Sequence, residues 1–92
     1  MIIRIISEGQ YRFPGAKLDD LNEIDNSLVD VVASDDRETF HRLFKTMVEM
    51  VRTQGTLLAD DELEESDAVI PEPDITLEEA KSLFIGAGVV PG

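Results

Sequence analysis

The single histidine, His41, is the first residue to consider for catalysis, because histidine is the commonest general acid or base in enzymes. It lies beside Arg37, Glu38 and Lys45 on the polar side of a predicted helix. The spacing does not force a serine or a carboxylate against the His41 ring as a catalytic partner. We therefore expect His41 to face solvent, we predict no catalytic residue, and we predict that the protein is not an enzyme.

Carboxylates that could bind a cation are concentrated in the segment of residues 58–68. They are Asp60, Asp61, Glu62, Glu64, Glu65 and Asp67. Calcium loops of the helix–loop–helix type need alternating ligands and a central glycine, and this segment has neither. We interpret it as a solvated acidic loop that docks a basic partner, with ion or ligand sensing as the alternative function. No metal or cofactor site is predicted.

The charge and cysteine content narrow the classes of partner and chemistry. Twenty acidic side chains against eight basic ones give a net charge of −12, which disfavours nucleic acids and anionic lipid surfaces as direct partners. There is no cysteine, so disulfides, thiolate metal sites and cysteine nucleophiles are excluded. The apolar run at residues 2–6 is too short to span a membrane. We expect a soluble, cytoplasmic protein forming one domain over residues 1–92.

The elements that must position these side chains follow from the period of the apolar residues. Residues 2–6 and 10–13 predict a β-hairpin, because Gly9 supplies turn chemistry between them. Apolar residues then recur at helical spacing over residues 17–33 and again up to residue 54. Two amphipathic helices with so short a connection are expected to pack as an antiparallel hairpin.

Local signals predict where the second helix begins and ends. Asp35 with Glu38 has the character of a capping box, and Asp36 with Thr39 is another register for the same start. Gly55 is predicted to end the helix in a left-handed conformation.

The C-terminal third contains a further strand and a short helix. Val69 and Ile70 predict a brief strand that pairs beside the first one. Thr76 followed by Glu79 is a capping box for a third helix, whose apolar face is Leu77, Ala80 and Phe84. Gly86-Ala87-Gly88 follows a helix, whereas a dinucleotide-binding loop opens one, so we interpret residues 86–92 as a flexible tail.

Isoleucine occurs on both faces of the first strand. Ile3 and Ile5 share one face, while Ile2 and Ile6 share the other. The helical hairpin is expected to cover one face, and the third helix with Val89-Val90 part of the other. A homodimer, or a strand added by another chain, is the alternative cover.

The predicted fold class is α+β, with a small antiparallel sheet packed on the helical hairpin and a short C-terminal helix. The sheet comprises the N-terminal hairpin and the brief third strand. If Tyr11 and Arg12 are exposed near the hairpin, they form a contact patch together with the acidic loop.

Three blocks of the sequence resemble a known family in their order and spacing. They are MIIRIISEGQYRFP, LDDLNEIDNSLVDVV and PEPDITLEEAKSLFIGAGVVPG. Together they are similar to the phage-shock-protein-A-associated domain, although Ala87 stands where that pattern has a glutamate. The resemblance implies an accessory role in envelope stress, with phage shock protein A, a helical membrane-remodelling protein, as the partner. It implies no catalytic residue, and membrane recruitment would occur only through that partner.

Overall fold

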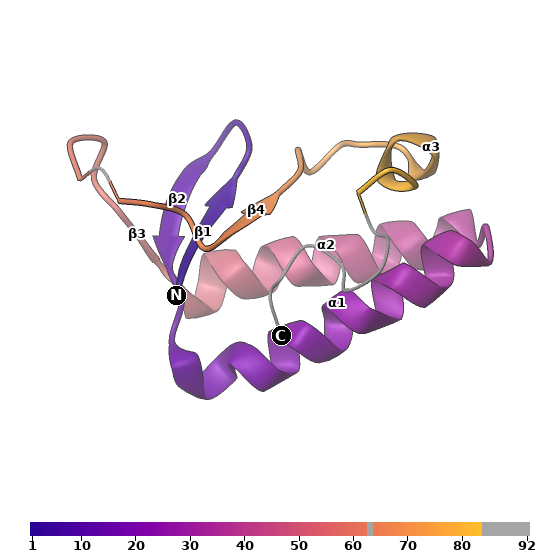
Figure 1. The fold of residues 1–92 in the computed structure, drawn as a ribbon, viewed down its shortest axis with the longest axis horizontal. Helices are drawn as coiled ribbons and strands as arrows, with labels where there is room; N and C mark the ends of the chain where they lie inside the picture. The colour runs from indigo at the N-terminus through magenta and orange to yellow at the C-terminus, as the bar shows by residue number, and fades with distance from the viewer. Residues whose placement is uncertain (63, 84–92) are drawn as a thin grey trace.

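The computed structural model describes residues 1–62 and 64–83 of the chain. Its elements, in chain order, are β1 (Ile2–Ile5), β2 (Gly9–Arg12), the 3-10 turn η1 (Gly15–Lys17), α1 (Leu18–Ala33), α2 (Arg37–Gln54), β3 (Thr56–Leu57), β4 (Ala68–Ile70) and α3 (Leu77–Ala80). Figure 1 shows the two long helices side by side in one layer, with the strands and α3 in a second layer above them. The α+β class and the helical hairpin are confirmed.

The sheet has the strand order β3-β2-β1-β4, so β1 lies inside it. β1 pairs with β2 in antiparallel and with β4 in parallel orientation, and Arg4 and Ile5 lie opposite Val69 and Ile70. The predicted pairing of residues 69–70 beside the first strand is confirmed. The sheet is mixed rather than purely antiparallel, and it gains a fourth strand, β3, which pairs with β2.

The ends of α2 correct two details of the sequence analysis. Asp36 is the N-cap, and its side chain accepts a hydrogen bond from the Thr39 backbone N–H at 3.2 Å, which is the second of the two registers considered. Gly55 has φ −90° and ψ 168°, an extended conformation, so the predicted left-handed stop is wrong. Glycine is needed there for space, because a Cβ would lie 2.6 Å from the Val51 carbonyl oxygen.

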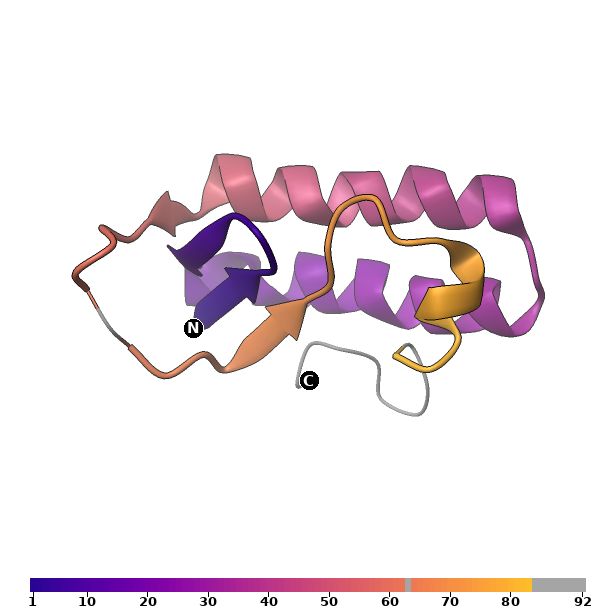
Figure 2. The same cartoon turned by 90° about the horizontal axis from the view of Figure 1, so that it is seen from above.

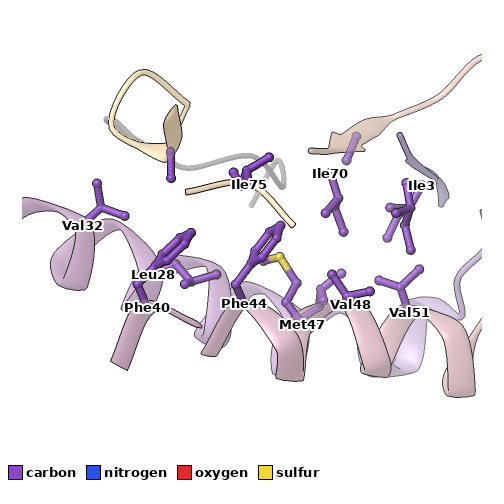
Figure 3. Packing of buried hydrophobic residues seen from close by; sticks show 14 of the residues in the cluster. Ile3, Leu28, Val32, Phe40, Phe44, Met47, Val48, Val51, Ile70 and Ile75 are labelled. Atoms are coloured by element: carbon purple, nitrogen blue, oxygen red, sulfur yellow. The ribbon is translucent and has the colours of Figure 1, made fainter. Parts of the chain in front are cut away.

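The core lies between the sheet and the helical hairpin (Figure 3). Ile3 and Ile70 extend from the sheet toward Val48 and Val51 of α2. The rings of Phe40 and Phe44 stack with their centroids 5.5 Å apart. Contributions from α1 and from the segment before α3 complete the cluster, including Leu21, Leu28, Val32 and Ile75.

The third helix was expected to cover part of the outer face of the sheet, and it does not. It contacts α2 and lies beyond the end of the sheet, on the same side of the hairpin as the strands (Figure 2). Two ion pairs hold it there, between Arg37 and Glu78 at 2.5 Å and between Lys81 and Asp35 at 2.6 Å. Its capping box is present as predicted. The predictions for Phe84, Gly86-Ala87-Gly88, Val89-Val90 and the tail fall outside the described residues.

Candidate protein-interaction surface

The acidic loop crosses the outer face of the sheet. Strands β3 and β4 lie at opposite edges, and the helices occupy the inner face, so the chain between them must pass over the outer face. Figure 1 shows this segment leaving β3 and returning across the strands to β4. We call residues 58–67 the acidic crossover.

The C-terminal half of the acidic crossover is fixed to the outer face by hydrogen bonds. The side-chain amide of Gln10 donates to the Glu64 carbonyl oxygen at 2.6 Å and to the Ser66 hydroxyl at 2.8 Å. Asp67 accepts from the Ile2 backbone N–H at 2.8 Å and donates its own N–H to the Ile2 carbonyl at 2.7 Å. Gln10 is only 7% exposed, so these bonds satisfy a buried amide, and breaking them would be costly.

The crossover accounts for the second apolar face of β1. Ile2 is 7% exposed and Leu58 is 8% exposed, yet both lie outside the main core cluster. Ile2 is therefore covered within this chain, by the acidic crossover, and needs no second chain to bury it. Ile6 is half-buried, while Arg4 and Val69 remain exposed on the same face.

Two of the predicted contact residues occupy different environments. Arg12 is exposed on the outer face and forms an ion pair with Glu64 at 2.6 Å. Tyr11 lies on the inner face, 8% exposed, with its hydroxyl 3.3 Å from the Glu8 carboxylate. The expected surface exposure therefore holds for Arg12 and not for Tyr11. Strict alternation places Tyr11 with Ile3, its cross-strand neighbour, on the core side.

The six carboxylates divide into engaged and available groups. Glu64 and Asp67 are bonded to the sheet, and Glu62 accepts from the Ala59 N–H at 3.0 Å within the crossover itself. Asp60, Asp61 and Glu65 are exposed, and their side chains form neither an ion pair nor a hydrogen bond with any residue of 1–62 or 64–83. Between the crossover and the sheet lies a pocket of about 140 Å³, where Arg4 and Gln10 face Asp60 and Glu62.

A family model described as PspA-associated protein matches residues 1–92. The chain belongs to the PspA-associated protein family. The resemblance that the sequence blocks indicated is thereby confirmed, and the family description points to an accessory role alongside PspA. Comparison with curated proteins and with solved structures returned no match to this chain.

In this PspA-associated protein, other features bear on alternative functions. His41 is exposed, and its ring makes an edge contact with Phe40 at 5.3 Å between centroids. Among residues 1–62 and 64–83, no three or more histidine, aspartate and glutamate side chains are grouped to hold a metal ion. Within the same residues, no helix has the length and apolar character needed to cross a bilayer.

An ion pair joins the β1–β2 turn to α2. The sequence spacing gave no reason to expect it. Glu8 in the β1–β2 turn pairs with Arg52, which also contacts Glu49 at 3.3 Å. The hydrogen bond from Arg52 lowers the pKa of the Glu8 carboxyl below its usual value. Burial raises the pKa of the neighbouring Tyr11 hydroxyl. The pairing joins residues 44 positions apart, so helical spacing rules give no sign of it.

The Glu8 ion pair predicts a pH-dependent contribution to stability. Because the folded-state pKa of Glu8 lies below its unfolded value, the contribution is present above about pH 4.5 and is lost as the pH falls through the folded pKa. Glu8→Gln should therefore lower the free energy of unfolding at pH 7 by about 0.2–1 kcal/mol, the usual range for a partly exposed pair.

Urea titrations of the two proteins at pH 7 and at about pH 3 test this expectation, since their difference should shrink at the lower pH. Glu65→Gln is the matched control, because Glu65 forms no ion pair with a described residue. A difference for Glu8→Gln that stays constant with pH would contradict the assignment.

Proposed function

We propose that this PspA-associated protein is a non-enzymatic accessory module that binds phage shock protein A through the acidic crossover. The family membership of the whole chain supports the choice of partner. The main structural support is that hydrogen bonds fix the crossover at residues 64–67. Asp60, Asp61 and Glu65 nevertheless stay exposed, without ion pairs to described residues. A surface of this kind presents carboxylates to a basic partner without needing to fold first.

Electrostatics gives the proposed contact its mechanism. A net charge of −12 attracts basic segments and orients them before contact, so the complex should form faster and more tightly at low salt. The same basic segments of a membrane-remodelling protein would also attract anionic lipid headgroups. The acidic crossover therefore competes with the membrane for them. Arg12, paired with Glu64, lies at the border of this contact and fixes its orientation.

The proposal also sets where the protein acts. Under this proposal the protein acts in the cytoplasm. It reaches the inner face of the membrane only when phage shock protein A carries it there. Whether the contact restrains or activates that partner depends on which basic segment it occupies.

Neutralising the free carboxylates tests this function. The triple variant Asp60→Asn, Asp61→Asn, Glu65→Gln should weaken binding to phage shock protein A about tenfold, because three exposed charge contacts of about 0.2–1 kcal/mol each are lost. Isothermal calorimetry with the purified partner measures the change. For the unmodified protein, raising the salt to about 1 M, where charges are screened beyond about 3 Å, should reduce the affinity in the same direction.

A matched control separates the crossover from the overall charge. The variant Asp20→Asn, Glu23→Gln, Asp30→Asn removes the same charge from the exposed face of α1 and should bind nearly as well as the unmodified protein. Equal losses in the two triple variants would exclude the crossover as the contact. A rise in melting temperature with Ca²⁺ at matched ionic strength would instead favour the ion-sensing alternative.

A further inference from the structure

The charges of the two long helices are segregated. α1 carries five carboxylates and no lysine or arginine. α2 carries four of the eight basic residues of the chain, Arg37, Arg42, Lys45 and Arg52, together with two carboxylates. An otherwise strongly acidic protein therefore presents a helix with a positive balance.

The exposed side of α2 is hollowed on both sides of a ridge formed by Lys45 and Glu49. One hollow, of about 310 Å³, has the exposed side chains of His41, Arg52 and Pro73 in its lining. Phe44 and Val48 also line it, but they belong to the core and are each 2% exposed. The other, of about 380 Å³, is lined by Thr46, Met50, Thr53 and Gln54. Lys45 and Glu49 belong to both linings.

A ridge at i, i+4 spacing between two grooves is the relief into which a second helix packs. The side chains of one helix form such ridges, and those of a partner helix lie in the grooves beside them. The apolar side chains that remain accessible are the exposed Pro73 in one hollow and the half-buried Met50 in the other, and both suit contact with leucine-like side chains. The shape of this surface thus favours a helix over an extended peptide or a small molecule.

The charges on this surface select the chemistry of that helix. Lys45 makes no ion pair with any described residue, and neither does Arg42 on the same helix. Glu49, the carboxylate on the ridge, already contacts Arg52. An incoming carboxylate would therefore meet a free ammonium group at Lys45, whereas an incoming lysine would meet a like charge.

We propose that the exposed face of α2 docks an acidic amphipathic helix of a protein partner, whose carboxylates pair with Lys45 while its apolar residues contact Pro73 and Met50 in the two hollows. This surface is distinct from the acidic crossover and of opposite charge. The protein would thus hold basic and acidic segments at two separate places.

Two synthetic peptides test the proposal without requiring the natural partner. Both are designed as stabilised helices with leucine pairs at i, i+4; the remaining positions are glutamate in one and lysine in the other. Titrated into the ¹⁵N-labelled chain, the glutamate peptide should shift amide signals of residues 41–53. Lys45→Glu should weaken its binding about tenfold, as expected for a charge pair replaced by a repulsion.

Lys17→Glu is the matched control, because Lys17 is exposed in η1 and the substitution changes the net charge by the same amount. It should leave the affinity for the glutamate peptide nearly unchanged. Equal weakening by Lys17→Glu and Lys45→Glu, or binding of the lysine peptide at residues 41–53, would overturn the proposal. So would concentration-dependent shifts at these residues without peptide, which would make a second copy the occupant. None of these three results bears on the acidic crossover, which is tested by its own triple variants.

Discussion

Replacing Phe40 with alanine is expected to lower the free energy of unfolding by about 3–5 kcal/mol. The Phe40 side chain is fully buried and stacks on Phe44 between the helical hairpin and the segment that leads to α3. The variant loses the free energy gained by transferring a large ring from water into the core, and a cavity remains where the ring was. Since small proteins are stable by only about 5–15 kcal/mol, this single change should remove a large fraction of the total.

Urea denaturation followed by far-ultraviolet circular dichroism measures the effect, with Leu43→Ala as the control in the same helix. Leu43 is half-buried at the edge of the core, so its truncation should cost much less. Similar losses for the two variants would mean that the ring of Phe40 is not part of a close-packed core.

Replacing Gly55 with alanine is expected to destabilise the protein by about 1–3 kcal/mol, because the new methyl group has no space. It would lie 2.6 Å from the Val51 carbonyl oxygen, 3.3 Å from the Tyr11 Cβ and 3.4 Å from the Arg12 carbonyl oxygen. Two of these neighbours belong to β2 and one to the last turn of α2, so relief requires the helix and the sheet to separate. The backbone conformation itself suits alanine.

Gly15→Ala provides the opposite expectation in the same protein. A Cβ at Gly15 meets nothing within 4 Å, and the substitution reduces the freedom of the unfolded chain. It should be neutral or stabilising by up to about 1 kcal/mol. Thermal unfolding of the two variants distinguishes steric crowding from loss of glycine flexibility, because the second effect alone would give both variants the same sign.

The helices and the central strands could be predicted because their signals are local. Apolar periodicity and capping residues locate α1, α2 and the start of α3, and each acts within a few residues. Asp25 shows the limit of that reasoning. It is 1% exposed in α1, at a position where the rule that carboxylates face water gives no reason to expect burial.

The features that were not predicted depend on which distant segments meet. β3 has only two residues. It forms because α2 ends next to β2, so that the residues after the helix can pair with that strand. The conformation of Gly55 follows from the same close approach. The acidic segment contains no helix or strand over residues 58–62 and 64–67, and its path over Ile2 depends on the strand order, which no local pattern contains. For the candidate site, composition located the carboxylates, and only the fold separates the engaged ones from the free ones.

The position of β1 between β2 and β4 has a consequence for synthesis of the chain. β2 follows β1 almost at once, whereas β4 is made only after both long helices and the acidic crossover. Until then one edge of an isoleucine-rich strand is unpaired, and such an edge can template association with other nascent chains. Closing so distant a contact is also slow. The five carboxylates of α1 are synthesised soon after β2, so their charge repels neighbouring chains during the interval in which that edge is open.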